Sequence, residues 1–284
     1  MTEIAPNLAK APPLGEARDR ELLKEAHSFL YHRTPHGDLA SHFFFPWGHS
    51  EDASAPIVVF FHGGLWDASM PTQFIPHCHF FTARGAVAAT VEYRVRDKHG
   101  TGVLEALEDA ATVAVFLREN AKVLGIDPGK IIFAGAGSGA HLALACGTLP
   151  RIGERNPEDY RPAALLLCSP IVDTTKGGVG VTRFPSPREA ETHSPSKFLK
   201  KRQPPAMIFH GKLDRIVPFE QVEKFARKYH RKNPPGELIG FDGAAHTFFN
   251  YNTNEQNYEI IMHSSDHFLV DLGLLAPDPL AGDY

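Results

Sequence analysis

Short apolar runs alternate with helical patterns along most of this chain, and this alternation limits the folds that the chain can adopt. The first run, IVVFF, is continuous and rich in β-branched side chains, which favours a strand buried on both faces. Strands separated by helices are typical of βαβ units, so we expect an α/β fold with a mostly parallel central sheet and helices on both faces. The predicted strands cover residues 57–61, 86–93, 131–134, 164–168, 206–209 and 237–241.

Apolar residues between the predicted strands recur with the period of a helix. The clearest helix is expected over 103–124, where apolar positions follow alternating steps of four and three and Gly125 provides a stop. A flexible polar arm over residues 1–18 is expected to precede a single domain over 19–284. Further helices are predicted over 71–84, over 219–229 after Pro218, and over 258–272 before Gly273.

Residues 171–203 interrupt this rhythm. They contain proline, glycine, lysine and arginine with little periodicity, and they lie between two predicted strands. A long irregular segment inside a compact domain is usually functional or disordered. Two interpretations stay open: a lid or cap over a site, and a plain surface excursion.

Composition argues against several classes of partner. The net charge of −4 provides no basic surface for nucleic acid or an anionic membrane. Three scattered cysteines predict reduced, buried thiols and not a disulfide framework. No stretch approaches the roughly 20 apolar residues of a membrane span, and the N-terminus does not read as a signal peptide. We therefore expect a cytoplasmic protein with no nucleic-acid or membrane partner.

The strand predicted over 131–134 leads directly into a glycine-rich turn. The sequence GAGSG over 135–139 is followed by the helical pattern HLALA. This matches the nucleophile elbow G-x-S-x-G, except that the middle residue is Gly137 and the serine follows as Ser138. Glycine adopts such a turn easily but carries no side chain that can attack. The alternative is a glycine-rich turn that packs a helix against the sheet or binds phosphate. GAGSG has neither the lysine of a P-loop nor the G-x-G-x-x-G spacing of a dinucleotide site.

A second glycine pair follows the first predicted strand, in the sequence HGGLW over 62–66. Without Cβ atoms, Gly63 and Gly64 let backbone N–H groups turn inward, as an oxyanion hole requires. A tight strand-exit turn is the alternative. His62 is expected to hold this loop.

An acid and a base follow two later strands. Asp214 lies in HGKLDRIVP and His246 lies in GAAHTFF, each just beyond a predicted strand. A carboxylate there can orient a catalytic histidine, and the chain order elbow, Asp, His is that expected of Ser-His-Asp hydrolases on a parallel sheet. Asp173 and Asp242 are reserve candidates for the acid. Taken alone, Asp214 could be a solvated loop aspartate and His246 could be a surface histidine.

No metal or other cofactor is expected. His77, Cys78 and His79 are adjacent, so their side chains point in different directions, and no partner pair stands at a zinc spacing. Most of the 16 histidines are expected to be surface or packing residues, including His141 after the elbow.

From about residue 38 to 273 the chain resembles α/β-hydrolase esterases of the hormone-sensitive-lipase, kynurenine-formamidase and feruloyl-esterase-like type. The resemblance rests on HGGLW, VEYR, LGIDP, GAGSGAHLA, HGKLDRIVP and GAAHTFF. It implies an oxyanion hole from Gly63, Gly64 and the N–H of Ser138, with Asp214 as acid and His246 as base. It also implies a serine at position 137, and there the sequence departs from the pattern.

Three functions remain open on these grounds. In the first, the protein is a hydrolase of a small-molecule ester, amide or other carbonyl compound. The attacking group would be Ser138 or a water molecule activated by His246. Alternatively, the His–Asp base abstracts a proton in lyase, condensation, decarboxylation or cyclisation chemistry. The third possibility is an inactive binding protein. Trp66 and Phe248 are expected to line the substrate site, whose substrate the sequence does not specify.

Overall fold

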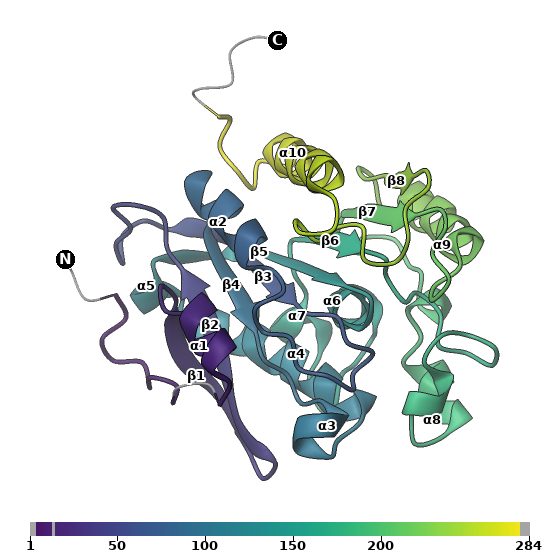
Figure 1. The fold of residues 1–284 in the computed structure, drawn as a ribbon, viewed down its shortest axis with the longest axis horizontal. Coiled ribbons are helices and arrows are strands. Elements are labelled where there is room, and N and C mark those ends of the chain that lie inside the picture. Colours follow the sequence, from purple (N-terminus) through teal and green to yellow (C-terminus); the bar gives the residue numbers. More distant parts are fainter. Residues whose placement is uncertain (1–3, 13–14, 279–284) are drawn as a thin grey trace.

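The structure is a computed structural model that describes residues 4–12 and 15–278. In this part of the chain, eight strands form one sheet in the order β1-β2-β4-β3-β5-β6-β7-β8 (Figure 1). β2 is antiparallel to both of its neighbours, and the remaining pairs are parallel. The strands are β1 (His27–Thr34), β2 (Gly37–Phe44), β3 (Ala55–Phe61), β4 (Val87–Val91), β5 (Ile126–Ala136), β6 (Ala164–Cys168), β7 (Ala206–Gly211) and β8 (Leu238–Phe241).

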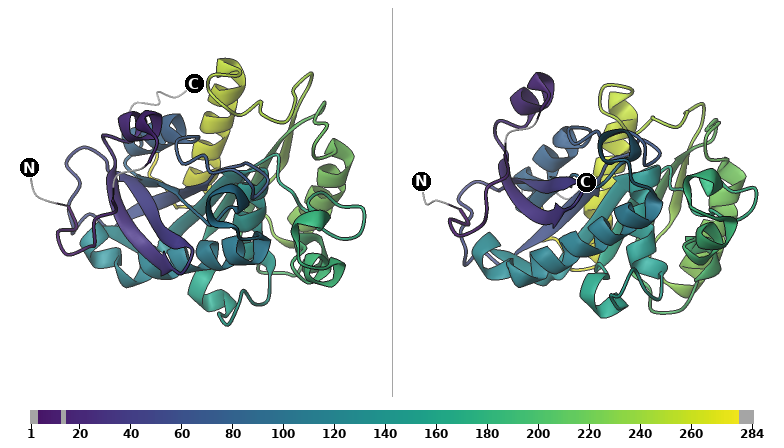
Figure 2. Two further views of the ribbon diagram at one scale, coloured as in Figure 1. Left: turned by 60° about the horizontal axis from the view of Figure 1, so that its bottom comes forward. Right: turned by 90° about the horizontal axis from the view of Figure 1, so that it is seen from below.

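Helices cover both faces of the sheet, as the sequence predicted (Figure 2). Alternate residues of β3 point to opposite faces: Val59 packs in the core with α4, α6 and α9, and Val58 in the core with α2 and α10. The helices are α1 (Ala17–Leu22), α2 (Ile75–Ala83), α3 (Arg96–His99), α4 (Val103–Glu119), α5 (Ala121–Leu124), α6 (Ser138–Thr148), α7 (Pro157–Tyr160), α8 (Pro187–Thr192), α9 (Phe219–Lys232) and α10 (Glu255–Asp271).

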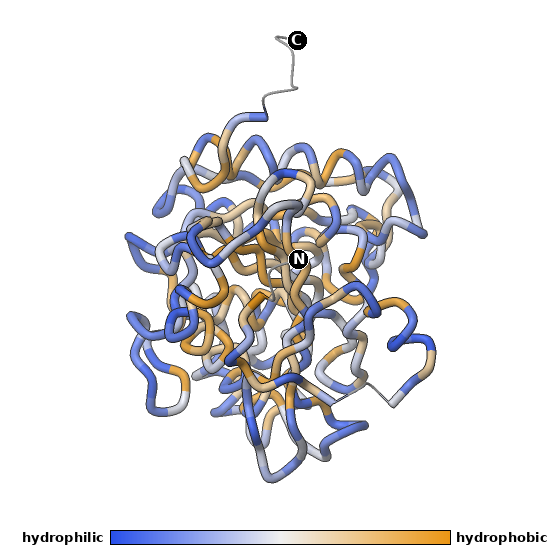
Figure 3. Tube along the Cα trace, turned by 90° about the vertical axis from the view of Figure 1, so that its left-hand side faces the viewer, coloured by the Kyte–Doolittle hydropathy of each residue, from blue (hydrophilic) through white to orange (hydrophobic). Residues whose placement is uncertain are grey.

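The apolar segments gather in the interior, and the hydrophilic segments lie on the outer loops and helix surfaces (Figure 3). All three cysteines are buried and unpaired. In the part of the chain that the structure describes, no helix combines the length and apolar character that crossing a membrane requires.

The predicted strands and helices are present, with some differences in their bounds. β5 begins at Ile126 and not at Ile131, and the helix expected over 103–124 is divided at Asn120 into α4 and α5. β1 and β2 form an antiparallel hairpin that was not predicted from the sequence. Only alternate residues of β1 are buried, so this strand contains no continuous apolar run.

The expected N-terminal arm is only partly described, since residues 1–3 and 13–14 lie outside the described residues. In the described part, the N–H of Ala11 donates to the carbonyl of Ser28, and Ala9 accepts from Leu30. The described part of the arm is therefore hydrogen-bonded along β1, the strand at one edge of the sheet.

The register of the parallel strands brings their carboxyl ends to one edge. Across adjacent strands, the register places Phe61 opposite Gly135, Ala136 opposite Cys168, Cys168 opposite Phe209, and Gly211 opposite Phe241. The loops that follow these strands therefore meet at the same edge, where parallel sheets bind their ligands.

Residues 171–203, the cap segment, connect β6 to β7. This segment contains α8 and two short 3₁₀ helices, η1 (Val181–Arg183) and η2 (Pro195–Lys197). Its Ser196 N–H donates to the carbonyl of Val172, which closes the segment on itself near its base.

Candidate active site

Gly137 alone separates β5 from α6, so the chain turns there within one residue. Its φ is 53° and its ψ is −113°, a conformation that L side chains rarely adopt. The N–H of Gly137 donates to the carbonyl of Cys168 at 3.0 Å, and its own carbonyl accepts from the N–H of His141. The elbow geometry expected from the sequence is therefore present, with glycine at its tip.

The two outer glycines of the elbow allow the backbones to approach closely. A Cβ on Gly135 would lie 2.7 Å from the carbonyl oxygen of Phe61, and one on Gly139 would collide with the carbonyls of Phe61 and His62. Any larger residue would push α6 away from β3. These glycines explain why the helix starts directly beneath the loop at 62–66.

His246 and Asp214 form a hydrogen-bonded pair at this edge. The Nδ1–H of His246 donates to Oδ2 of Asp214 at 2.7 Å. Oδ1 of Asp214 accepts the N–H groups of Ile216 and Val217 at 2.8 and 2.9 Å. Burial raises the pKa of Asp214, but the hydrogen bonds from His246 and Val217 outweigh burial and lower the pKa below its usual value. The carboxylate therefore stays ionised and fixes the imidazole with Nε2 as the acceptor.

The Nε2 atom of His246 faces the tip of the elbow. It would lie 3.2 Å from a Cβ placed on Gly137. Among the described residues it has no hydrogen-bond partner, and the side chain of His246 is 17% exposed. A base thus faces the position where the resemblance implies a nucleophile, and no side chain occupies that position.

Ser138 is the first residue of α6 and is buried. Its side chain is 1% exposed, and among the described residues its hydroxyl has no hydrogen-bond partner. The Ser138 side chain lies near the phenol of Tyr93, whose O–H donates to the carbonyls of His62 and Gly63 at 2.8 and 3.2 Å. The Ser138 hydroxyl is therefore enclosed beside Tyr93, and a catalytic role for it stays a prediction.

The loop at 62–66 lies against the elbow but offers fewer donors than expected. The N–H of Gly63 donates to Oε1 of Gln73 at 2.7 Å, so it is already occupied. Within the described residues, the N–H groups of Gly64 and Ser138 have no hydrogen-bond partner. Gly64 has φ 109°, and a Cβ there would lie 2.6 Å from the carbonyl of Ala68. Two of the three expected oxyanion donors therefore remain free.

His62 holds this loop, as the sequence indicated. Its Nδ1–H donates to the carbonyl of Gly63 at 2.7 Å, and its ring stacks on Tyr93 with centroids 4.2 Å apart. Burial lowers the pKa of His62 to about 4, so the ring is neutral.

The two predicted wall residues are buried. Trp66 is 1% exposed and packs edge-on against His141 on α6 and against Phe184 of the cap segment. Phe248 is 2% exposed and packs on Phe241 with centroids 4.7 Å apart. Phe248 is thus a core residue, because the chain turns inward two positions after His246.

Sequence reasoning missed two groups around the site. Ser169, the residue after β6, has φ 45° and donates its hydroxyl to the carbonyl of His246 at 3.0 Å. Asp67, beside the 62–66 loop, pairs with Arg96 at 3.2 Å and with Arg183 of the cap segment at 2.5 Å. The position of Ser169 at a strand's carboxyl end was a usable signal, whereas the Asp67 pairs join distant segments.

Nothing in the described residues resembles a metal centre: no group of three or more His, Cys, Asp or Glu side chains could hold an ion. His77 lies instead among the rings of Phe60, Phe74 and Tyr258. Asp173 accepts from Thr175 and Ser194 within the cap segment, and Asp242 pairs with Lys212 at 2.8 Å. The two reserve candidates for the acid are therefore engaged elsewhere.

This sheet order, with an elbow after β5, an acid after β7 and a histidine after β8, defines the chain as an α/β-hydrolase. The family model described as BD-FAE matches residues 45–164 and 172–229. The chain belongs to the BD-FAE family. The predicted α/β-hydrolase fold and its esterase-type resemblance are confirmed.

Solved structures of an esterase share this fold over nearly their whole length. Esterase 2 of Thermogutta terrifontis, phosphoramylated by tabun, superposes with a TM-score of 0.84 and is 32% identical, covering 90% of this chain and 98% of that chain. The same esterase phosphorylated by paraoxon gives the same TM-score and identity.

Curated relatives match over a smaller part of their length. Esterase LipC of Mycobacterium tuberculosis is 24% identical over 222 residues, which cover 66% of this chain and 53% of the relative. Endo-1,4-beta-xylanase B of Butyrivibrio fibrisolvens is 28% identical over 145 residues, 45% of this chain and 22% of the relative. The chain thus spans about half or less of the length of these curated relatives.

Proposed function

We propose that the protein hydrolyses a small carboxylic ester or amide by activating water directly with His246, without an acyl-enzyme. One observation carries this proposal: Nε2 of His246 faces Gly137 across an unoccupied position, 3.2 Å from where a Cβ would stand. The esterases among its relatives support an ester or amide as substrate.

The proposed step needs only the groups already described. Nε2 of His246 accepts a proton from water while the water oxygen bonds to the carbonyl carbon. The carbonyl oxygen becomes an oxyanion, which the N–H groups of Gly64 and Ser138 stabilise at the start of α6. The imidazolium, paired with Asp214, then protonates the departing alkoxide or amine. The tetrahedral intermediate collapses to the carboxylic acid.

The expected rate is modest. Without a triad nucleophile, an oxyanion hole and substrate binding leave roughly 10³–10⁴-fold catalysis over water. We therefore expect activity on reactive esters such as p-nitrophenyl acetate, with a linear time course from the first turnover. A burst of p-nitrophenol requires a covalent intermediate, and this mechanism contains none.

The test combines this assay with paraoxon, which phosphorylates Thermogutta terrifontis esterase 2. The unaltered protein should show slow hydrolysis without a burst and should gain no mass on incubation with paraoxon. His246→Ala should abolish the hydrolysis, and Ser138→Ala should leave it within about twofold. Gly137→Ser should gain both the burst and the mass shift. A burst in the unaltered protein would contradict the proposal. A loss of ester hydrolysis in Ser138→Ala would also contradict it.

A second candidate rests on the same free Nε2. A base beside an oxyanion hole also removes a proton from the carbon next to a carbonyl and stabilises the enolate. This candidate predicts that deuterium from D₂O enters the α position of ketones with the unaltered protein and not with His246→Ala. Exchange without ester hydrolysis would favour the non-hydrolytic function.

A further inference from the structure

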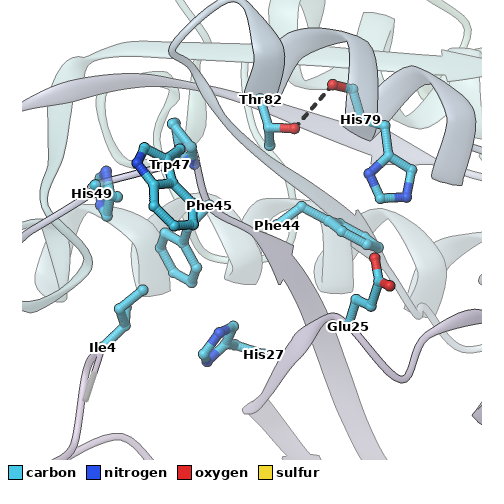
Figure 4. A pocket seen from close by; sticks show the side chains of 11 residues that line it. Ile4, Glu25, His27, Phe44, Phe45, Trp47, His49, His79 and Thr82 are labelled. Atoms are coloured by element: carbon cyan, nitrogen blue, oxygen red, sulfur yellow. Dashed lines mark hydrogen bonds between the residues drawn. The ribbon is translucent and has the colours of Figure 1, made fainter. Parts of the chain in front are cut away.

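A hollow of about 530 Å³ lies far from the His246–Asp214 pair, at the other end of the strands. Figure 4 shows the side chains that line it. It forms where β2 ends: Phe44 pairs with Ala88, the second residue of β4, and so lies at the amino ends of the parallel strands. His246 and Gly137 lie beyond the carboxyl ends of the same sheet. The hollow is therefore separate from the site proposed for hydrolysis.

Aromatic side chains form much of its wall. Phe44 is the last residue of β2, and Phe45 and Trp47 lie in the loop between β2 and β3. The Trp47 side chain is fully exposed, at 103%. A single exposed apolar side chain is ordinary, but here a fully exposed indole adjoins two phenylalanines at a hollow, so that several ring faces are open to one ligand.

Three polar side chains that line the hollow are exposed to solvent. Glu25, His27 and His79 make no side-chain hydrogen bond or ion pair within the described residues, although both rings contact phenylalanines. Glu25 is the lining residue that carries a full charge. Burial and the charge of Lys10 lower the pKa of His27, so its imidazole is neutral at pH 7. The hollow therefore combines ring faces with one unpaired carboxylate.

We propose that this hollow binds a small organic cation, a quaternary or protonated amine, between the aromatic rings and the carboxylate of Glu25. The negative face of an aromatic ring attracts a cation, and Trp is the strongest of the three aromatic residues in this respect. Methyl groups on the ammonium would cover the rings of Phe45 and Trp47. A metal ion is not expected, since no three ligating side chains converge there in the described chain.

The two tryptophans of the chain make the binding directly observable. Trp47 is fully exposed and Trp66 is 1% exposed. Occupation of the hollow should shift the emission of Trp47 to shorter wavelength and protect it from acrylamide quenching. Trp66 is already shielded and serves as an internal control.

The experiment titrates the full-length protein with choline and with 3,3-dimethylbutan-1-ol, which has the same shape without the charge. A cation–π contact at a partly exposed site should make choline bind at least about fivefold more tightly. Methyl glucoside tests a neutral polar ligand. Equal binding of choline and the alcohol, a response to the glucoside alone, or no response to choline would each overturn the proposal.

Two variants test the residues by calorimetry, which does not depend on the indole. Trp47→Ala should weaken choline binding by about tenfold, and Glu25→Gln by about two- to fivefold. Glu51→Gln, an exposed carboxylate outside the hollow, is the matched control and should bind choline as the unaltered protein does. Unchanged affinity in Trp47→Ala would contradict the proposed site.

Discussion

Gly137 combines a strained position with an empty one. Its φ of 53° and ψ of −113° disfavour any side chain, and the nearest atom to an added Cβ is Nε2 of His246 at 3.2 Å. Glycine therefore retains the elbow backbone with less strain than serine would impose. The chain retains the turn and the His246–Asp214 pair, and no side chain stands at the elbow tip.

Gly137→Ala is expected to affect both stability and activity. The added methyl group should lower the free energy of unfolding by about 1–3 kcal/mol, because alanine is strained at this φ. It should also abolish water-dependent ester hydrolysis, since the methyl group occupies the position proposed for the water. Urea unfolding and the p-nitrophenyl acetate assay measure the two effects. Full hydrolytic activity in Gly137→Ala would show that the water does not stand at the elbow tip.

Ser169 is expected to act through the position of His246. Its hydroxyl holds the carbonyl of His246 at 3.0 Å while its own φ is 45°. Ser169→Ala should lower kcat for ester hydrolysis roughly tenfold and leave KM nearly unchanged, because small displacements of a base are costly. Ser169→Gly is the matched variant: it also loses the hydroxyl but relieves the strained φ. A normal kcat in either variant would leave Ser169 with a structural role only.

At the scale of elements, the features that sequence reveals are those that act within a few residues. The β-branched run of β3 and the glycine spacing of the β5–α6 turn are local, so both were predictable. The hydrogen bond from Ser169 to His246 joins residues that are 77 positions apart. The hydrogen bond that occupies the N–H of Gly63 is accepted by Gln73, from the next loop. The hairpin β1–β2 was missed because its alternating burial includes histidine, serine and arginine.

The cap segment packs against Trp66 of the 62–66 loop. A Cβ on Gly180 would lie 2.5 Å from the indole of Trp66, and Asp67 binds Arg183 in the same region. Gly177 lies in the same segment with a similar φ, 86° against 82°, but a Cβ there would meet nothing within 4 Å. Substitution of Gly177 therefore tests the effect of backbone strain alone, whereas substitution of Gly180 adds a clash with Trp66.

Gly180→Ala should displace the cap segment from Trp66, whereas Gly177→Ala should not. Both variants carry the strain of a positive φ, about 1 kcal/mol or more. Only Gly180→Ala should also red-shift the emission of Trp66, measured in a Trp47→Phe background, and speed proteolysis within 171–203. Identical spectra and cleavage rates for the two variants would argue that the cap segment does not depend on this contact.

At the scale of the whole molecule, buried histidines link stability to pH. Burial lowers the pKa of His62 to about 4 and the pKa values of His77 and His141 to about 3, from about 6.5 for an exposed histidine. All three are nearly or fully buried. Between pH 6.5 and these values, the unfolded chain binds protons that the folded chain does not.

The free energy of unfolding has its full value above pH 6.5 and falls as the pH decreases. The decrease is about 1.4 kcal/mol per pH unit for each histidine, and therefore about 4 kcal/mol per pH unit for the three together. A domain with about 5–15 kcal/mol of total stability should therefore unfold near pH 4–5. Urea unfolding at pH 7, 6 and 5 measures this dependence. His77→Phe, which keeps an aromatic ring among Phe60, Phe74 and Tyr258, should reduce the slope by about 1.4 kcal/mol per pH unit even if overpacking lowers stability at every pH. An unchanged slope in that variant would mean that His77 is protonated without unfolding the chain.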